Sequence, residues 1–396
     1  MPSFDPQSAL EHASAVAFPR LVGSPGESRA ARYIADRLRR SGLRVTEEPF
    51  GFSLRPWAVL RGALVLSAAA TLLAVWAVGR SLPLSGLLAV LPVAVGGCSG
   101  RLTLRLLSGA VREEKEVAGN AGLGRSLNLV ARRPEDTGRE RPLVVLMAHY
   151  DSKGQGASLV LRILLFLAFA AGGVGLFVRA VWPGVRVEAG LDLPSTAFGL
   201  LSALSALALA PMRVDNGSPG AVDNASGVGV LLGLAEAVGG DPLAFPGVDL
   251  VFAATGAEEV GLQGAFALLK RHAEEMKGRR VCVLNFDGPG VAGNIYASSK
   301  TGLRPRSPLL MRRVREAGEA EGIRVRAPAF VIGAMADHFP FAAAGIEAVT
   351  LAAVGRDSLA IHTPGDTPDR LNAETMGRVG RIALAVIEKI QQECVP

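Results

Sequence analysis

The chain has 396 residues, of which 49% are apolar, and its mean hydropathy of +0.32 is high for a purely soluble protein, so membrane segments are expected. The net charge of +6 comes without any block of interleaved basic and aromatic residues, which argues against nucleic-acid binding. Three cysteines far apart and without CxxC spacing argue against disulfides and a thiolate metal site. No charged-then-apolar leader opens the chain, so no cleavable signal peptide is expected.

The first predicted element is a helix that follows Ser24. Ser24 is a candidate N-cap, Pro25 takes the first helical position, Glu27 completes a capping box, and Gly42 ends the helix. Strands are predicted in "LRVTEEPF", "LNLVARR", "PLVVLMAH", "VDLVFAAT", "RVCVLNFD", "GNIYAS" and "AVTLAAV", and helices at about 225–238, 262–276, 308–321 and 373–392. Several strands are nearly continuous Val and Leu runs, as expected where helices cover both sheet faces. The predicted fold class is α/β, a three-layer α/β/α sandwich with a mixed, mainly parallel sheet.

Two pairs of apolar runs interrupt this pattern. Gly62–Gly79 and Ser81–Gly100 are separated by Arg80, and a second pair covers about Ala157–Trp182 and Leu193–Met212. Each run is close to the roughly 20 helical residues that cross a hydrocarbon core. Buried core helices of a soluble protein are the alternative, but four charge-poor runs in two close pairs favour transmembrane hairpins. We therefore predict four spans in contact with a lipid bilayer.

Polar side chains gather where predicted strands end, which is where α/β sheets bind ligands. These residues are His149 and Asp151 in "VVLMAHYD", Asp223 in "GAVDNASGVGV", Glu258 and Glu259 in "VFAATGAEEVG", Asp287 in "CVLNFDGPG", and His362 in "SLAIHTPGDTPDRL". Each could serve singly as a helix cap or turn residue. So many acids and imidazoles at separate strand ends are not expected by chance. Imidazole and carboxylate without sulfur suit zinc, with manganese or cobalt as weaker alternatives.

These motifs have a recognisable order. His-x-Asp, Asp-Asn-Ala-Ser-Gly, Glu-Glu, Asn-Phe-Asp and His-Thr-Pro-x-Asp-Thr resemble metallopeptidase family twenty-eight, the co-catalytic di-zinc aminopeptidases whose relatives include glutamate carboxypeptidase and glutaminyl cyclase. "GSPGESRAARYIADRLRRSGLRV" and "DHFPFAAAGIEAVTL" are also similar to that family's pattern. The resemblance covers nearly all of the chain outside the hairpins. It implies a zinc aminopeptidase-like fold and an exopeptidase that removes N-terminal residues from peptide substrates.

The resemblance also implies a role for each site residue. Asp223 would bridge two zinc ions, of which one is completed by His149 and Asp287 and the other by Glu259 and His362. Glu258 would act as general base on the bridging water, and Asp151 would orient and polarise His149. The family's peptide bond after the bridging Asp is cis, so a cis bond is expected at Asp223–Asn224.

Four positions depart from the pattern or stand outside it. Ala336 replaces a frequent Ser before Asp337 and His338, which we interpret as substrate-pocket or supporting groups and not as ligands. Gly288 follows Asp287 where many relatives carry a bulkier residue, so the pocket is expected to be reshaped. The remaining histidines, at positions 12 and 272, are expected on solvent-exposed helix faces.

The second hairpin lies between the His-Tyr-Asp-Ser and Asp-Asn-Ala-Ser-Gly motifs. The predicted organisation is a catalytic domain formed by 1–55, 102–156 and 213–396, with transmembrane hairpins at 56–101 and 157–212. We expect the active site near the membrane surface, where it could receive peptides released from the bilayer. Basic residues near the spans favour a cytoplasmic catalytic domain at a bacterial-type plasma membrane. Seven basic residues lie on the catalytic domain's side of the membrane: Arg55, Arg61, Arg101, Arg105, Lys153, Arg162 and Arg213. Three lie on the opposite side: Arg80, Arg179 and Arg186.

Other readings of the same motifs stay open. "HYDSK" at 149–153 is similar to glutaminyl cyclases, zinc acyltransferases that typically use a single metal ion. A non-catalytic receptor-like binding module is a third reading, although such relatives have lost ligands or the base that this chain retains. A carboxypeptidase or dipeptidase is a further variant. The sequence does not specify the preferred N-terminal residue, the oligomeric state or the native metal.

Overall fold

The computed structural model describes residues 2–78, 80–97, 109, 111–113, 123–134, 141–182, 192–239, 241, 243–301, 304–328 and 335–393. Cys98, Cys394, Arg101, Arg105 and Arg186 lie outside these residues. The chain divides into two compact units. The α/β unit comprises Met1–Ser53, Val111–Gln155 and Val214–Pro396, and the helical unit comprises Leu54–Ala110 and Gly156–Arg213.

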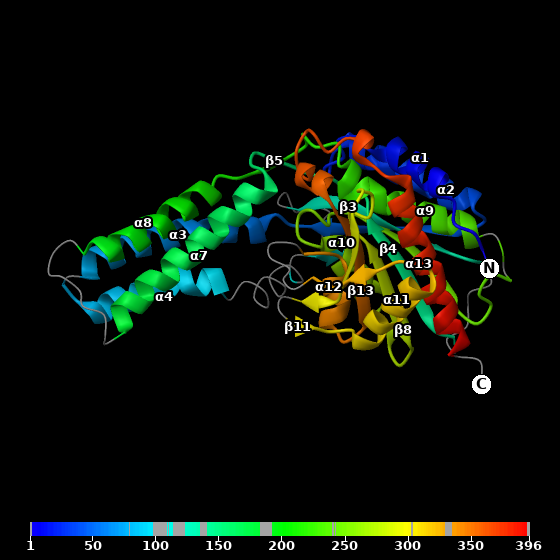
Figure 1. Cartoon of the computed structure of the whole chain (residues 1–396). Helices are drawn as coiled ribbons and strands as arrows, with labels where there is room; N and C mark the ends of the chain where they lie inside the picture. Colours follow the sequence, from blue (N-terminus) through cyan, green and yellow to red (C-terminus); the bar gives the residue numbers. More distant parts are fainter. Residues whose placement is uncertain are drawn as a thin grey trace. The chain divides into compact units, whose positions relative to one another are not determined.

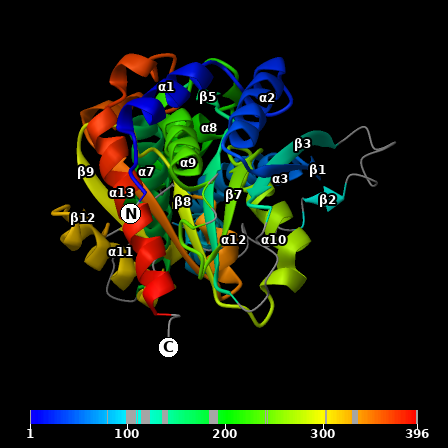
Figure 2. The same cartoon turned by 90° about the vertical axis from the view of Figure 1, so that its right-hand side faces the viewer.

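A mixed sheet forms the centre of the α/β unit (Figures 1 and 2). Among the described residues it has nine strands, in the order β12-β9-β13-β8-β4-β7-β3-β1-β2. Their bounds are β1 Arg44–Phe52, β2 Arg112–Glu113, β3 Gly124–Arg132, β4 Leu143–His149, β7 Asp249–Thr255, β8 Val281–Phe286, β9 Asn294–Ser298, β12 Val325–Arg326 and β13 Glu347–Val354. Strands β13, β8, β4 and β7 run parallel, as do β12 and β9, whereas the other pairs are antiparallel. The sheet is therefore mixed as predicted, with parallel pairing at its centre and at one edge. It is not mainly parallel, because four of the eight pairings among the described strands are antiparallel.

Short ribbons of two strands lie outside this sheet. One pairs β5 (Gly154–Gln155) with β6 (Val214–Asp215), and the other pairs β10 (Lys300–Thr301) with β11 (Arg304–Pro305). The first ribbon joins the segments that follow β4 and precede the Asp223 turn. It therefore connects two parts of the chain that carry predicted site residues.

Helices cover both faces of the sheet, which gives the predicted three layers. On one face lie α1 (Pro6–Val16), α2 (Pro25–Arg40), α9 (Ser226–Val238), α11 (Pro308–Ala320) and α13 (Ala373–Gln392), and on the other lie α10 (Gln263–Met276) and α12 (His338–Ala343). Side chains alternate between these faces along β4, so that Leu146 packs with the first group and Val145 with the second. Two-sided burial explains why the central strands are nearly continuous apolar runs.

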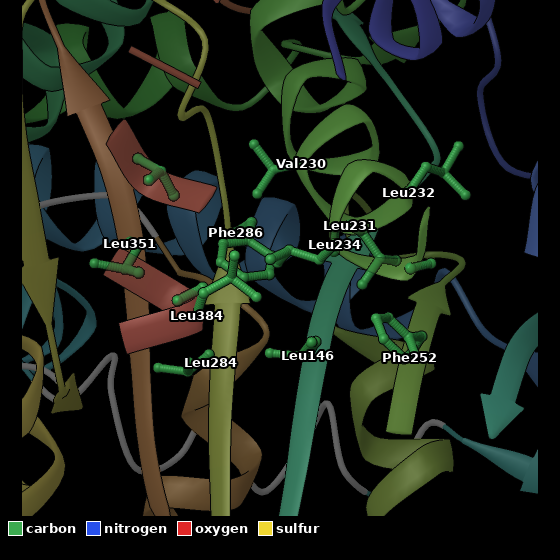
Figure 3. Close-up of a cluster of buried hydrophobic side chains, with 14 of the residues drawn as sticks. Leu146, Val230, Leu231, Leu232, Leu234, Phe252, Leu284, Phe286, Leu351 and Leu384 are labelled. Carbon is green, nitrogen blue, oxygen red and sulfur yellow. The ribbon is translucent and has the colours of Figure 1, made fainter. Parts of the chain in front are cut away.

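The larger core layer lies between the sheet and α9 (Figure 3). It contains Leu146 of β4, Phe252 of β7, Leu284 and Phe286 of β8, and Leu231 of α9, all completely buried. Burying one such side chain contributes roughly 1.5–3 kcal/mol. Because the central strands are packed from both sides, the positions of their carboxyl ends are fixed by the core.

Local signals set most helix boundaries, with one correction at α2. Ser24 Oγ accepts a hydrogen bond from the Glu27 amide at 3.2 Å, as predicted for an N-cap. The Glu27 carboxylate, however, accepts from the Gly23 amide at 2.6 Å instead of the Ser24 amide, so the capping box is only half formed. Its other oxygen accepts from Ser126 Oγ, which ties α2 to β3. Helix α1, capped by Asp5, contains His12, which was expected on a helix whose bounds the sequence did not give.

Within its described residues, the helical unit contains four apolar helices, α3 (Arg55–Val78), α4 (Leu82–Gly97), α7 (Leu159–Val181) and α8 (Leu193–Leu209) (Figure 1). Helix α3 begins well before the predicted Gly62. By length and composition α3 and α7 could cross a membrane, whereas α4 and α8 are shorter apolar helices. A third helical stretch of sufficient length, Ala221–Val238, is 83% buried. Its larger part is α9, so hydropathy alone does not separate this core helix from the others.

Large and small side chains are distributed in the helical unit in the opposite way to a soluble bundle. Exposed positions carry large apolar residues such as Leu66, Leu87 and Leu204. Most buried positions carry small or hydroxyl residues, although Leu64, Phe169 and Leu176 are buried as well. The small and hydroxyl residues include Thr71, Ala74, Ser85, Ala89, Gly172, Gly173, Ser202 and Ser205. Small residues at helix contacts with large apolar residues outside are typical of helices packed within lipid.

The two histidines expected to be exposed are not: His12 is buried and His272 is half-buried, each within a polar cluster, so that expectation was wrong. His12 Nε2 lies 2.7 Å from Glu236 Oε1, and its Nδ1 lies 2.9 Å from the Tyr33 hydroxyl. His272 contacts Glu48 at 2.9 Å and Glu275 at 3.1 Å. A polar helix face can thus be covered by another polar element, which a helical pattern alone does not reveal.

Truncation of the core layer should destabilise the α/β unit. Leu146→Ala removes a fully buried side chain from the centre of β4 and is expected to lower the free energy of unfolding by about 2–5 kcal/mol. Leu243→Ala, at a position 81% exposed, is the matched control and should stay within about 0.5 kcal/mol of wild type. Denaturant unfolding of the detergent-solubilised chain measures both. Equal effects of the two substitutions would contradict this core assignment.

The cluster around His272 should make stability depend on pH. Burial lowers the pKa of His272, but hydrogen bonds to Glu275 and Glu48 outweigh it and raise the pKa to about 9. The protonated ring therefore stabilises the fold below its unfolded pKa of about 6.5, and this contribution is lost as pH rises towards 9. The difference in the free energy of unfolding between wild type and His272→Gln should shrink by up to about 3 kcal/mol between pH 6.5 and 9. Thermal unfolding at several pH values measures it. A difference that stays constant over this window would refute the assignment.

Candidate active site

Parallel strands deliver the predicted site residues to one edge of the sheet. His149 is the last residue of β4 and lies opposite Thr255, the last residue of β7, after which Glu258 and Glu259 follow. Asp287 comes directly after β8, and His362 follows β13 by way of a short 3-10 turn at Arg356–Ala360. The carboxyl ends of parallel strands meet at the same edge. The structure therefore brings these residues together, as the sequence predicted.

Asp223 lies at the centre of this cluster. It belongs to an irregular turn, Ala221–Ala225, that precedes α9, and its peptide bond to Asn224 is cis as expected. Its two carboxylate oxygens face different imidazoles. Oδ1 lies 3.1 Å from His149 Nε2, and Oδ2 lies 3.0 Å from His362 Nε2. One carboxylate is thus shared between two histidines.

Each histidine has a second carboxylate beside it. We call His149, Asp223 and Asp287 group one, and Asp223, Glu259 and His362 group two; in each, the potential ligand atoms lie within 4.8 Å of one another. His149 Nε2 is 3.8 Å from Asp287 Oδ1, and His362 Nε2 is 3.4 Å from Glu259 Oε2. Ligands about 2.1 Å from a tetrahedral zinc stand about 3.4 Å apart. The separations and the oxygen and nitrogen donors therefore fit two neighbouring metal sites.

Glu258 is close to both groups but belongs to neither. Its Oε2 lies 4.0 Å from His149 Nε2, and burial raises its pKa well above the ordinary value. The residue before it, Ala257, has a φ of 55°, and His362 has a φ of 64°. Left-handed backbone at non-glycine residues is uncommon and is often retained at functional sites. Glu258 is therefore a buried carboxyl group at the edge of the candidate metal site.

Asp151 supports the site in two ways. Its two carboxylate oxygens accept hydrogen bonds from the Glu258 and Glu259 amides, both at 3.1 Å. His149 Nδ1 lies 3.2 Å from the Asp151 carbonyl oxygen and 3.5 Å from the carboxylate. The carboxylate therefore fixes the Glu–Glu turn, a role that the sequence did not predict, while the backbone carbonyl is the nearer partner of His149.

Hydrogen bonding decides the charge of Asp223. Burial alone would raise the pKa of Asp223, but hydrogen bonds from His149 and His362 outweigh it and hold the pKa well below the usual range. Burial raises the pKa of Asp287. So many carboxyl groups in one buried place favour binding of cations, which would keep all of them ionised.

Asp337 and His338 are buried behind the site. Asp337 accepts a hydrogen bond from the Thr255 hydroxyl, and burial raises its pKa to about 7. His338 contacts Thr350 Oγ1 at 2.6 Å and the Lys300 carbonyl oxygen at 3.2 Å, and burial lowers its pKa to about 4. Of the two predicted roles, a supporting one fits this burial better than direct contact with a substrate.

Two residues that sequence reasoning missed hold the Asp223 turn. Asp366 accepts hydrogen bonds from the Val222 amide at 2.6 Å and the Asp223 amide at 3.2 Å. Arg20 is fully buried and donates to the carbonyl oxygens of Tyr150 at 2.7 Å and Gly220 at 2.8 Å. Arg20 therefore joins the segment after β4 to the segment before Asp223. The sequence gave a signal for Asp366, which is the Asp of "HTPGDT", but none for Arg20.

Gly220 shows how closely these segments approach. Its φ is +60°, and a Cβ at this position would lie 2.5 Å from the Ser152 Cβ. Both the backbone conformation and the space exclude a larger residue. The glycine thus permits the contact through which Arg20 links the two loops.

Lys153 is a third residue whose place at the site was not predicted. Its Nζ lies 2.7 Å from Glu259 Oε2, and its side chain is 12% exposed. In the sequence it had been interpreted only as a flanking charge and as part of "HYDSK". The structure places its ammonium group directly against a residue of group two.

Part of the chain is similar to known peptidases. Residues 200–387 match the model of Peptidase family M28. Aminopeptidase YwaD of Bacillus subtilis is 29% identical over 188 residues, which span 45% of this chain and 40% of that relative. The aligned region thus covers less than half of either protein.

Solved structures resemble the chain over nearly its full length. The zinc aminopeptidase BSAP from Bacillus subtilis has a TM-score of 0.57 at 16% identity, covering 98% of this chain and 96% of that one. An aminopeptidase from Aneurinibacillus sp. strain AM-1 has a TM-score of 0.55 at 17% identity, covering 98% and 94%. A glutaminyl cyclase from Fimbriiglobus ruber has a TM-score of 0.55 at 15% identity, covering 98% and 97%. These likenesses show the fold, which is zinc aminopeptidase-like.

Proposed function

We propose that this chain is a membrane-anchored, zinc-dependent aminopeptidase that removes N-terminal residues from peptides. The observation that carries the proposal is the shared carboxylate of Asp223, which faces two histidines, each with its own second carboxylate, beside the buried Glu258. The match to Peptidase family M28 and the aminopeptidase relative support the reaction class.

The donor sets assign the residues that would hold two zinc ions. Group one would hold one ion and group two the other, with Asp223 common to both. Bound there, the ions supply Lewis acidity, which polarises the scissile carbonyl and lowers the pKa of the attacking water. The carbonyl and carboxylate of Asp151 keep His149 and the Glu–Glu turn in position for this arrangement.

The proton transfers fall to Glu258. Its carboxylate accepts a proton from the attacking water as the water's oxygen bonds to the scissile carbonyl carbon. It then donates that proton to the leaving amine as the C–N bond breaks. The buried environment that raises the pKa of Glu258 helps it to carry the proton between these two steps.

Membrane anchoring is supported by the helical unit itself. Its exposed surface carries large apolar side chains, whereas most of its buried positions carry small or hydroxyl-bearing ones. Exposure of this apolar surface to water is unfavourable, whereas its contact with lipid is not. We infer that both hairpins insert into the bilayer, that the α/β unit is cytoplasmic, and that peptides derived from membrane proteins are its substrates.

A glutaminyl-cyclase-like acyl transfer is the second candidate. Cyclases occur among the structural neighbours at TM-scores close to those of the aminopeptidases, and Lys153 completes the "HYDSK" segment that resembles them. In that reaction the substrate's own N-terminal amine would attack its glutamine side-chain amide and release ammonia. The two reactions therefore leave different products from the same glutamine-initiated peptide.

Replacement of the general base should separate these possibilities. Zinc-loaded wild-type protein in detergent is expected to release free amino acids from short peptides, and Glu258→Gln should reduce kcat by about 10²–10⁴-fold with an unchanged zinc content. Amino-acid analysis of a peptide panel that includes glutamine-initiated members measures this. Ammonia and pyroglutamyl peptide instead of amino acids would establish the cyclase. Zinc binding without either product would favour a non-catalytic binding module.

The orientation of the hairpins has an independent test. Alkaline phosphatase fused after Pro396 should be inactive in a bacterial host and green fluorescent protein at the same place should fluoresce, because the α/β unit is expected in the cytoplasm. Both fusions should remain in the membrane pellet after an alkaline carbonate wash. Active phosphatase would reverse the orientation, and release by carbonate would argue against insertion.

A further inference from the structure

The strongest unexplained feature of the site is the position of Lys153. Its Nζ donates to Glu259 Oε2 at 2.7 Å and also lies 3.4 Å from the Glu259 carbonyl oxygen. Oε2 is the same oxygen that lies 3.4 Å from His362 Nε2. The ammonium group therefore contacts the atom that group two would offer to a metal ion.

The Glu259 carboxylate cannot easily avoid this ammonium group. Its other oxygen, Oε1, is buried and has no hydrogen-bond partner within the part of the chain that the structure describes. A metal ion in group two must either share Oε2 with Lys153 or bind Oε1 of the same carboxylate. In both cases a dication and a buried ammonium group lie beside one carboxyl group.

Group one has a different environment. The side chain of Asp287 is 21% exposed, whereas that of Glu259 is 3% exposed. Among the described residues, Asp287 forms an ion pair with His149, which belongs to the same group. The bridging Asp223 is common to both groups. Lys153 therefore makes the two groups unequal in charge although their donor types are the same.

We propose that Lys153 makes the two metal sites unequal, so that group one binds zinc tightly and group two binds it weakly and exchangeably. Like charges close together in a poorly solvated place repel strongly, and a neutral side chain at 153 would remove this repulsion. The inference rests on the proposed use of both groups as metal sites. It implies an enzyme that changes between one-metal and two-metal forms with the zinc concentration around it.

Calorimetric zinc titration of the full-length, metal-free protein in detergent tests this directly. Wild type should show one tight and one weak binding event. Lys153→Met and Lys153→Gln should each tighten the weak event at least tenfold and leave the tight event within about threefold. Lys153→Arg, which keeps the charge, should retain the weak event. Two variants assign the events to their groups: Glu259→Gln should abolish the weak event, and Asp287→Asn should weaken the tight one.

The outcomes separate this inference from the proposed function. Because zinc binding is measured without a substrate, an inactive enzyme with the expected affinities would leave the inference intact. Two equally tight events in wild type would overturn it. Unchanged or weaker second binding in both Lys153→Met and Lys153→Gln would also overturn it, and would show that Lys153 acts only by holding Glu259 in place.

Discussion

The site depends on the position of the Asp223 carboxylate between two histidines. Its oxygens lie 3.1 and 3.0 Å from the two imidazoles, and these contacts keep its pKa low in a buried place where desolvation acts in the opposite direction. His149 ends a central strand, whereas His362 comes from a loop more than two hundred residues later. The rest of the α/β unit serves to bring these three side chains together.

Rigidity around Asp223 comes from groups that never face a substrate. The core on both faces of β4, β7 and β8 fixes where those strands end, and Asp151 then holds the Glu258 and Glu259 amides at one of those ends. Asp366 and Arg20 hold the Asp223 turn through backbone groups. Buried charged groups that hydrogen-bond to the backbone position the site as firmly as apolar packing does.

Both units contain strongly apolar helices, but these helices differ in whether their large apolar side chains are buried or exposed. Helix α9 and helices α3 and α7 are all apolar, yet α9 is buried between the sheet and its neighbouring helices. The helical unit instead has Leu66, Leu87 and Leu204 on its exposed surface and Thr71, Ser202 and Ser205 inside. Lipid makes that second arrangement favourable, because outward leucines and tightly packed small residues are both stable there.

The sequence by itself determined the α/β class, most strand and helix positions, and the cluster of His149, Asp223, Glu259, Asp287 and His362 that the fold brings together. Nearly continuous apolar runs, helix-capping residues and acids at strand ends are local patterns, so they can be read without coordinates. Tertiary structure alone decided the partners of long side chains. It placed the Lys153 ammonium group beside Glu259 and the Asp151 carboxylate beneath the Glu–Glu turn. It also placed His12 beside Glu236 and His272 beside Glu48. Each of these contacts joins residues distant in sequence, and no local pattern specifies which polar groups meet across a core.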